Sequence, residues 1–256
     1  HWYDQRLKGI DTGVDDEAPI KLFVMGKNTW RDEYEWPLER TEWTKFYLSS
    51  NGNAADDDGS LSTEIKTIDQ TSDSFIYDPE DPVPSIGSQY QTFDFCGPRD
   101  RSHIQLRPDV LTFTTDVLTE DLEITGPISA TVWASSDAID TDFTATLTDL
   151  EPEGKAIALC EGIVRARFRD GTENPQMIIP GKIYKFEIDM WNTSNSFNKG
   201  HRIRIEISSS NFPRYNRNLN SGNPIANDTD ITIANQTVYH GSKYPSHINL
   251  PLIPAR

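Results

Sequence analysis

Hydrophobic and polar residues alternate with a period of two in several segments of the second half of the chain. Within residues 202–208, three isoleucines alternate with two arginines and a glutamate, and within residues 164–169 three apolar residues alternate with three arginines. Successive side chains of a β-strand point to opposite faces of a sheet. The pattern therefore predicts strands that have one buried face and one face in water.

Short apolar or alternating runs, separated by turn residues, recur from residue 109 onward, and three more occur before it. Ile, Val and Thr, which favour strands, outnumber Ala and Leu, which favour helices, by about two to one. The sequence therefore predicts an all-β fold with the topology of an antiparallel sandwich. The predicted strands cover residues 20–25, 45–48, 74–77, 110–114, 122–125, 128–135, 143–150, 156–168, 183–190, 202–208, 231–238 and 248–250.

The front of the chain has a different pattern. Residues 1–9 predict the end of an amphipathic helix that stops at Gly9. Residues 10–19 are acidic, rich in turn residues and poor in apolar ones, which is typical of a linker. We therefore expect the helix end at 1–9, the linker at 10–19 and one β-domain over residues 20–256.

A segment dense in tryptophan separates the first two predicted strands. Trp30, Trp36 and Trp43 stand among charged residues there. Such rings suit a surface that stacks on sugars or docks a partner, but they can also fasten a long loop to the core. The second reading is the expected one, and the first stays open.

Residues 78–108 contain no predicted strand and begin with three prolines within six residues. Proline removes a hydrogen-bond donor from a sheet, so an irregular path is expected. A run of this length inside a domain is usually functional or covered by a partner. Its aromatic residues Tyr90, Phe93 and Phe95 suit the lining of an apolar pocket, or are simply buried under the loop.

The chain is acidic, with 24 Lys+Arg against 40 Asp+Glu and a net charge of −16. This charge argues against nucleic acid or an anionic membrane as a partner. No run of 18 apolar residues and no signal-peptide pattern occurs. Cys96 and Cys160 form no CxxC pair, so we expect two buried free thiols, which favours a reducing compartment such as the cytoplasm.

The sequence lacks the usual catalytic motifs. It has no G-x-S-x-G pentad, no HExxH pair among its five histidines and no Gly-rich phosphate loop. We therefore expect no cofactor, no metal ion and no self-contained active site in this chain.

Clusters of aspartate have two readings. Asp137, Asp140 and Asp142 surround the start of one strand, where they could hold a metal ion or act as an acid–base pair. Aspartates at such places more often bond turn amides, and we expect that role here. The run Asp56–Asp58 lacks the EF-hand pattern and is expected to form a solvated turn.

The arginines of residues 165–169 and 202–204 lie on strand faces and could bind an anion. Ion pairs on a sheet face, or at a domain interface, are the expected role. His247 lies in the last predicted strand, where we expect a core histidine with a hydrogen-bond partner rather than a catalytic one.

Short motifs lie in a fixed order along residues 20–251. They are Phe23–Gly26, Trp30–Glu33, Trp36–Leu38, Phe46–Leu48, Tyr77–Ser85, Arg107–Leu111, Asp140–Ala145, Glu161–Arg165, Gly200–Ile203, Ser208–Arg214 and Pro245–Ile248. Together they resemble the C-terminal domain of the X-Pro dipeptidyl-peptidase and cocaine-esterase family of serine hydrolases. Residues Trp2–Gly9 look like the end of the last helix of the α/β-hydrolase domain that precedes it in that family.

The resemblance implies a jelly-roll β-sandwich, like a galactose-binding domain, that packs against an upstream α/β-hydrolase domain carrying a Ser-Asp-His triad. The triad would lie before His1, so no catalytic residue is assigned to this chain. In such relatives a loop of this domain reaches the substrate cleft. The matching loop is about residues 88–96, which makes Tyr90, Phe93 and Phe95 candidate substrate-pocket residues.

Three functions follow from these observations. The first is an accessory domain of a serine hydrolase that acts on a small ester, amide or X-Pro peptide, with this chain inactive alone. The second is an independent carbohydrate-binding jelly-roll module that uses its exposed tryptophans. The third is a domain that only stabilises the hydrolase or its oligomer.

Overall fold

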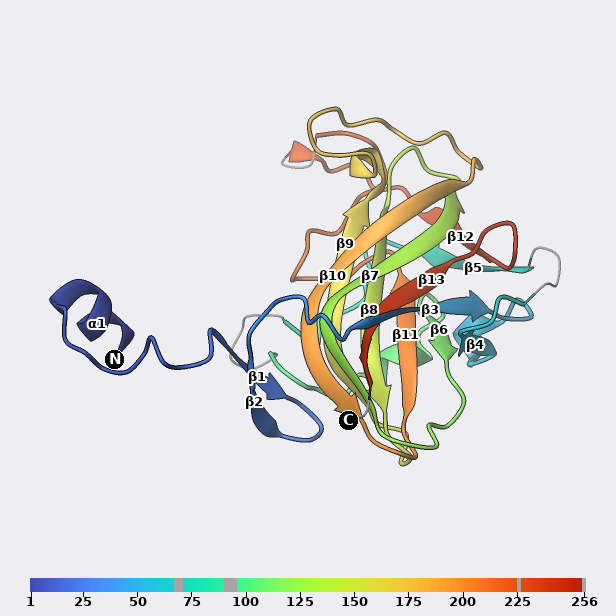
Figure 1. Ribbon diagram of the computed structural model, residues 1–256. Helices are drawn as coiled ribbons and strands as arrows, with labels where there is room; N and C mark the ends of the chain where they lie inside the picture. The colour runs from blue at the N-terminus through green and yellow to red at the C-terminus, as the bar shows by residue number, and fades with distance from the viewer. Residues whose placement is uncertain (67–70, 90–95, 225–226, 255–256) are drawn as a thin grey trace.

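Two layers of mostly antiparallel strands form the body of the protein (Figure 1). The computed structural model describes residues 1–66, 71–89, 96–224 and 227–254. In these ranges no helix is both long and apolar enough to cross a lipid bilayer. The elements in chain order are α1 (Trp2–Lys8), β1 (Ile20–Val24), β2 (Thr29–Glu33), β3 (Glu42–Ser49), η1 (Ala54–Asp56), β4 (Gly59–Ser62), β5 (Thr71–Tyr77), η2 (Ile104–Leu106), β6 (Leu111–Thr114), β7 (Leu122–Ser136), β8 (Asp142–Leu150), β9 (Ala156–Arg165), η3 (Ala166–Phe168), β10 (Tyr184–Phe197), β11 (Arg202–Ser208), β12 (Ala234–His240) and β13 (His247–Ile253).

The strands are hydrogen-bonded in the order β5-β12-β7-β13-β3-β4-β6-β11-β8-β9, and β10 also pairs with β7. Among the paired strands of the described residues, only β4 and β6 run parallel to each other, and β1 and β2 form a separate hairpin. The chain folds this sheet over on itself, and β10 of one layer approaches β9 of the other. A β-carbon on Gly162 of β9 would lie 2.1 Å from the carbonyl oxygen of Asp189 of β10. The predicted jelly-roll β-sandwich is confirmed.

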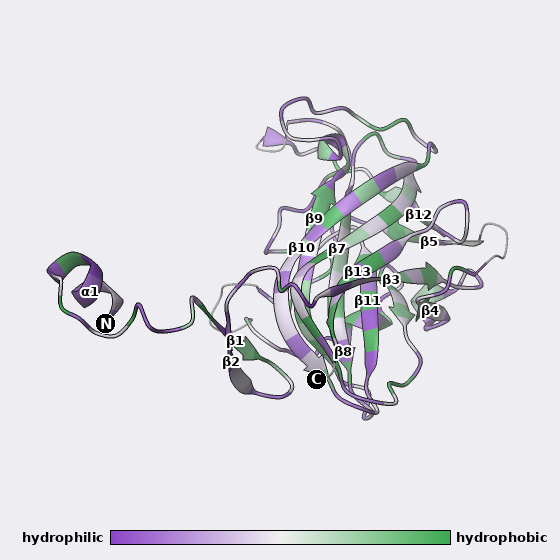
Figure 2. Ribbon diagram, in the orientation of Figure 1, coloured by the Kyte–Doolittle hydropathy of each residue, from purple (hydrophilic) through white to green (hydrophobic). Residues whose placement is uncertain are grey.

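The core lies between the two layers. Ile203, Ile205 and Ile207 of β11 are fully buried, as their alternation predicts. Phe143 of β8 meets Phe186 of β10, with 4.7 Å between ring centroids. Each such buried side chain stabilises the fold by about 1.5–3 kcal/mol, and Figure 2 shows apolar residues recurring along the strands of both layers.

Arg202 at the start of β11 is exposed, but the rest of the charged face of this strand is not in water, which corrects the sequence prediction. Arg204 is only 8% exposed and Glu206 only 3% exposed. The long irregular segment covers this face, and its short helix η2 supplies Gln105 to both side chains. Alternation marks the two faces of a strand, but it does not show that a charged face is wet, because a loop can cover it.

Most predicted strands are present, with changed limits. The runs predicted at 122–125 and 128–135 form one strand, β7, and β9 ends at Arg165 because η3 follows it. The alternation at residues 164–169 therefore reflects a strand only in its first part. Two short strands, β2 and β4, were not predicted.

The predicted N-terminal helix is present as α1. Gly9 ends it in the left-handed region, with φ 66°, a conformation that glycine adopts readily. No residue of α1 is buried. In Figure 1 the helix stands apart from the β-layers, at the end of a segment without helix or strand that runs to Ile20.

Candidate functional site

Two short limbs of backbone flank residues 89–96, the region of the expected pocket loop. We call residues 85–88 and 97–101 the loop base. The two limbs meet where the N–H of Gly97 donates to the carbonyl oxygen of Ser88 at 2.9 Å. The predicted pocket residues belong to the sequence between these limbs and lie outside the described residues: Tyr90, Phe93 and Phe95.

Each limb is also hydrogen-bonded to other parts of the β-domain. In the first limb, the N–H of Ser85 donates to the carbonyl oxygen of Phe212 at 2.7 Å. In the second, the N–H of Arg101 donates to the carbonyl oxygen of Ala156 at 2.8 Å. The irregular segment therefore has a fixed path on both sides of the expected pocket loop.

A buried ion pair lies beneath the loop base. Arg101 and Glu206 have side chains that are 2% and 3% exposed, and Arg101 Nη2 lies 2.8 Å from Glu206 Oε2. Arg101 Nη1 also donates to the carbonyl oxygen of Ile86 at 3.0 Å. Burial lowers the pKa of Arg101, but the charge and hydrogen bonds of Glu206 outweigh it and leave the pKa raised. The guanidinium is therefore a permanent positive charge inside the fold.

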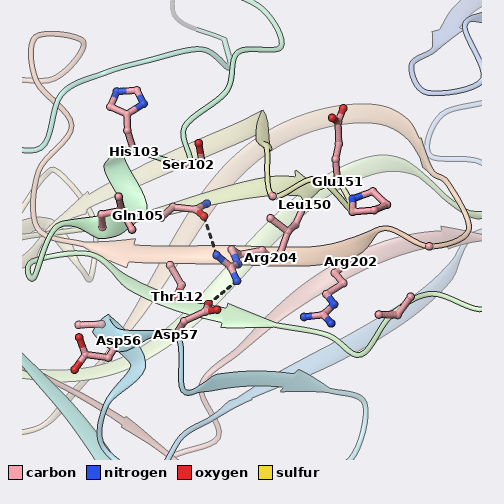
Figure 3. Close-up of a pocket in the computed structure, with 16 residues that line it drawn as sticks. Asp56, Asp57, Ser102, His103, Gln105, Thr112, Leu150, Glu151, Arg202 and Arg204 are labelled. Carbon is pink, nitrogen blue, oxygen red and sulfur yellow. Dashed lines mark hydrogen bonds and ion pairs between the residues drawn. The ribbon is translucent and has the colours of Figure 1, made fainter.

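The same network continues outward from Glu206, and Figure 3 shows its outer part, from Gln105 through Arg204 to Asp57. Gln105 Nε2 donates to Glu206 Oε1 at 2.8 Å, and Arg204 Nη1 donates to Gln105 Oε1 at 2.8 Å. Arg204 Nη2 then reaches Asp57 Oδ1 at 2.5 Å. Burial lowers the pKa of Arg204, and the nearby positive charge of Arg202 adds to this. Asp57, expected only as a solvated turn residue, is thus also an ion-pair partner.

Arg204 and Asp57 lie in a groove of about 890 Å³, shown in Figure 3. Leu106 at its edge is 84% exposed, and His103 and Arg202 line it as well. The charged and polar side chains that are buried in this groove are already paired with each other. The groove therefore shows polar binding surface but no arranged nucleophile and base.

A second buried carboxylate supports the first limb of the loop base. Glu161 is 1% exposed, and Arg214 Nη1 lies 2.6 Å from its Oε1 atom. The N–H of Arg214 donates to Ser85 Oγ at 3.1 Å. Burial raises the pKa of Glu161, although Arg214 and Arg101 oppose that shift.

The tryptophan-rich segment places its rings at the surface, so the expectation that they fasten a loop to the core is wrong. Phe23 and Trp30 pair across the β1–β2 hairpin, with 5.3 Å between ring centroids. We call the following rings the aromatic surface, with their exposed fractions: Phe23 39%, Trp30 68%, Tyr34 78%, Trp36 39% and Trp43 49%.

The β1–β2 hairpin that carries part of this surface is firmly attached. The N–H of Met25 donates to the carbonyl oxygen of Ser194 at 3.0 Å, and the N–H of Ser196 donates to that of Met25 at 2.8 Å. Arg31 Nη1 lies 2.6 Å from Glu123 Oε1. The exposed rings of Phe23 and Trp30 are therefore held in place, and their exposure does not result from a loose loop.

One buried group combines the residue types of a catalytic triad, and the sequence search did not find it. Ser50 Oγ lies 2.7 Å from Asp73 Oδ2 and 3.1 Å from His240 Nε2. His240 Nε2 also contacts Asp73 Oδ2 at 2.8 Å. A triad needs the carboxylate and the hydroxyl on different ring nitrogens, whereas here both contact Nε2. The group is a buried structural cluster whose members are too distant in sequence to form a motif.

The aspartates at the start of β8 are bonded mainly to arginine side chains and to a distant backbone amide, and not to the turn amides that were expected. Asp142 forms a two-pronged pair with Arg165, at 2.8 and 2.9 Å, and Asp140 pairs with Arg167 at 2.8 Å. Asp137 accepts the N–H of Asn235 at 2.8 Å. In the described part of the chain, no group of three or more metal-binding side chains is positioned to hold an ion.

The structure contradicts one of the predictions made for the cysteines and confirms the prediction made for His247. Cys160 is buried and Cys96 is exposed, and both are free, so the expectation of two buried thiols is wrong for Cys96. Burial raises the pKa of the Cys160 thiol. His247 is 9% exposed and its Nδ1 lies 2.7 Å from the carbonyl oxygen of Pro245, which confirms a core histidine with a partner.

Comparison with known proteins gives one family. A family model described as the X-Pro dipeptidyl-peptidase C-terminal non-catalytic domain matches residues 12–249. Cocaine esterase from Rhodococcus sp. (strain MB1 Bresler) is 46% identical over 258 residues, which cover 98% of this chain and 45% of that protein. A putative serine esterase from Mycobacterium tuberculosis is 28% identical over 98% of this chain and 40% of its own length. The chain thus spans less than half the length of these curated relatives.

Solved structures agree on the fold. An aminopeptidase from a marine sediment archaeon superimposes with a TM-score of 0.85 at 26% identity, over 99% of this chain and 43% of that one. An α-amino acid ester hydrolase gives a TM-score of 0.83 at 26% identity, over 98% and 43%. A CocE/NonD family hydrolase from Staphylococcus aureus shares the fold at 16% identity, with a TM-score of 0.69 over 98% and 44%.

Proposed function

This chain belongs to the family of X-Pro dipeptidyl-peptidase C-terminal non-catalytic domains, and we propose that it is the accessory domain of a serine hydrolase. In this proposal the β-domain packs against a catalytic α/β-hydrolase domain through the aromatic surface, and α1 is the end of the last helix of that catalytic domain. The catalytic domain contributes the serine that attacks the substrate carbonyl and displaces the alcohol or amine, and water then releases the acid from the acyl-enzyme. The substrate is a small ester, amide or peptide.

The observation that carries this proposal is the exposure of large apolar side chains on the attached β1–β2 hairpin and on α1. The aromatic surface exposes large rings on an attached hairpin, and α1 exposes Trp2, Tyr3 and Leu7 by 55%, 69% and 75%. A seven-residue helix is marginal by itself, because helix formation in water needs a longer chain or packing against a partner. Exposed apolar patches of this kind mark interaction sites.

We further propose that the segment between the two limbs of the loop base lines the substrate pocket. Tyr90, Phe93 and Phe95 would then contact the apolar part of the substrate. The support is the geometry of the flanks. Both limbs of the loop base are hydrogen-bonded to the β-domain, and they meet at the bond between Gly97 and Ser88.

The test has three parts. The chain alone should not hydrolyse a p-nitrophenyl ester above the buffer rate, and turnover would mean that it contains its own nucleophile. The sequence preceding His1 in the parent should contain a G-x-S-x-G elbow followed by Asp and then His. Removal of residues 20–256 from that parent should lower its melting temperature strongly, and an unchanged melting temperature would contradict the proposed packing.

A carbohydrate-binding module is the competing function, since exposed tryptophans also stack on sugars. Titration of the chain with a glycan panel separates the two. Binding that is lost in Trp30→Ala or Trp36→Ala would favour the module, whereas no binding is expected for the accessory domain.

A further inference from the structure

Trp191 of β10 has a backbone conformation that a bulky residue rarely adopts. Its φ is 66°, in the left-handed region where a large side chain costs free energy. The residue stands at a bulge, because the pairing of β10 with β7 shifts register between Asp189 and Asn192. The N–H of Trp191 donates to Asp189 Oδ1 at 2.8 Å and holds this conformation. Glycine or asparagine would fit here with less strain, so the fold of the β-domain does not require a tryptophan.

The ring of Trp191 is not part of the core. Trp191 is 59% exposed, whereas Ile188 and Met190 of the same strand are fully buried. The ring therefore stabilises this domain less than a buried ring would, and its backbone conformation lowers the stability. Strained residues cluster at sites that bind a ligand or a partner, which makes Trp191 a candidate contact residue.

The bulge that carries the ring is packed directly on the other layer of the sandwich. A β-carbon on Gly162 of β9 would lie 2.1 Å from the carbonyl oxygen of Asp189, so the two backbones are in contact at this point. The hydrogen bond to Asp189 also fixes the backbone of Trp191. A ring on such a rigid support loses little conformational freedom when a partner covers it, which favours binding.

Hydrogen bonds place Trp191 between the aromatic surface and the loop base. On one side, the carbonyl oxygen of Ser194 of the same strand accepts the N–H of Met25, in the β1–β2 hairpin, at 3.0 Å. On the other side, Gln89, next to the first limb, donates from Nε2 to the carbonyl oxygen of Met190 at 3.5 Å. Trp191 therefore lies beside both regions that the proposed function turns toward the catalytic domain.

More than half of a related protein is available to cover this edge of the domain. The chain corresponds to 45% of cocaine esterase, and its family model describes a C-terminal, non-catalytic domain. In the proposed parent, the catalytic domain already contacts the aromatic surface. Because Trp191 is continuous with that surface, the catalytic domain is favoured over a second copy of the chain as its partner.

From these observations we infer that Trp191 is an anchor residue of the interface with the catalytic domain. Its ring enters an apolar pocket of that domain, which also supplies an acceptor for the indole N–H. The strained bulge presents the ring outward and lowers the stability of the β-domain by itself. This inference rests on the proposed function and adds a contact on β10 to the proposed interface.

Thiol labelling tests whether a partner covers this position. Trp191→Cys is made in the full-length parent and in the chain alone, each with Cys96→Ser to remove the exposed native thiol. The new thiol should react with a disulfide reagent at least about tenfold more slowly in the parent. Ile76→Cys is the matched control, since Ile76 is 61% exposed on β5, on the other side of the domain from the β1–β2 hairpin (Figure 1). It should react equally fast in both proteins.

Trp30→Cys separates this inference from the proposal on which it rests. If Trp30→Cys is protected in the parent and Trp191→Cys is not, the proposed packing stands and the anchor role is wrong. If neither is protected, the proposed packing itself is wrong. Protection of Trp191→Cys in the chain alone, increasing with its concentration, would assign the ring to a second copy and overturn the inference.

The strain is measured in the chain alone. Trp191→Gly and Trp191→Ala both remove the ring, but only glycine adopts a positive φ readily. Trp191→Gly should therefore melt about 2–4 °C above Trp191→Ala. At Ile76, within the β5–β12 ladder, the order should be reversed, because glycine weakens a strand. A Trp191→Ala variant that melts at least as high as Trp191→Gly would remove the strain from which the anchor role is inferred.

Trp191→Gly also replaces Trp191→Cys if the latter does not fold. In the parent, loss of the ring should loosen the cover, so amide exchange in residues 189–193 should accelerate more than the same change accelerates it in the chain alone. Equal acceleration in the two proteins would count against the anchor role.

Discussion

A β-carbon on Gly26 would lie 2.0 Å from the carbonyl oxygen of Ser196. The turn of the β1–β2 hairpin therefore presses directly against the backbone of β10. Gly26 also has φ 79°, a conformation that residues with a side chain rarely adopt. The position of the hairpin, and of the rings that it carries, depends on this contact.

Gly26→Ala should therefore detach the hairpin and cost about 2–4 kcal/mol, from steric overlap combined with backbone strain. Gly13→Ala is the matched control, since Gly13 has φ 74° but nothing within 4 Å of the added carbon. Gly13→Ala should lower the free energy of unfolding by only about 1 kcal/mol, from backbone strain alone. Urea unfolding and amide exchange of β1 and β2 measure the difference. Similar losses in the two variants would show that the contact with Ser196 is unimportant.

Trp30→Ala should leave the stability of the chain nearly unchanged, because its ring is 68% exposed and its contact with Phe23 contributes about 1 kcal/mol. In the proposed interface, its loss should weaken binding to the separately expressed catalytic domain at least about tenfold. Calorimetric titration measures this affinity. Ile76→Ala, which removes a side chain of similar exposure on β5, is the control and should bind normally. A Trp30→Ala chain that binds as tightly as the wild type argues against this surface.

Asp73→Asn should destabilise the protein at neutral pH by about 3 kcal/mol, because the 1% exposed carboxylate accepts bonds from Ser50, Ala54 and His240. Burial raises the pKa of Asp73, but these bonds outweigh it and leave the pKa lowered. A lowered folded-state pKa gives stability that is present above the unfolded value of about 3.9 and is lost as the pH falls through the folded value.

The stability gap between wild type and Asp73→Asn should therefore narrow as the pH falls below about 4. Urea unfolding at several pH values tests this. Asp32→Asn, at an exposed position 3.8 Å from Lys21, should change stability by less than about 0.5 kcal/mol. A gap that stays constant with pH would show that the charge of Asp73 is not what stabilises the cluster.

The two thiols should differ in reactivity. Cys96 is exposed and should react with a disulfide reagent in the native protein, whereas Cys160 is buried and should react only after unfolding. One equivalent is expected without urea and two with it, and Cys96→Ser should remove the native reaction. Two equivalents in the native protein would contradict the burial of Cys160.

Cys160 should also contribute to the loss of folding stability at alkaline pH, because burial raises the pKa of its thiol. A group whose folded-state pKa is raised gives stability below the unfolded value, about 8.5 for cysteine, and loses it as the pH rises. Cys160→Ala should therefore show a shallower loss of stability above that pH. Parallel pH profiles of the two proteins would count against this role.

The sequence was sufficient for the β-fold because alternation is a local property. The alternating isoleucines of β11 are all in the core, and the long strands were predicted in most cases. β2 and β4 were missed because Thr29–Glu33 and Gly59–Ser62 are short and mostly polar. Such strands are stabilised by pairing and not by their own pattern.

The polar interior could not be predicted in the same way. Glu206 and Arg204 looked like a wet face, because no local signal shows that a segment a hundred residues earlier in the chain lies over them. The cluster of Ser50, Asp73 and His240 likewise joins three distant segments. Long-range burial of charge depends on tertiary packing, which spacing along the chain does not report.

The hydrogen bond between Ser88 and Gly97 defines a natural pair of boundaries for exchanging sequence. The sequence between Ser88 and Gly97 begins and ends at this hydrogen-bonded pair. Its residues can therefore be exchanged without changing how the strands of the domain are paired. Residues 89–96 could then be transplanted from a relative as one cassette, with Arg101 and Glu206 kept in the recipient. If residues 89–96 line the substrate pocket as proposed, such grafts would change substrate preference while the β-sandwich stays the same.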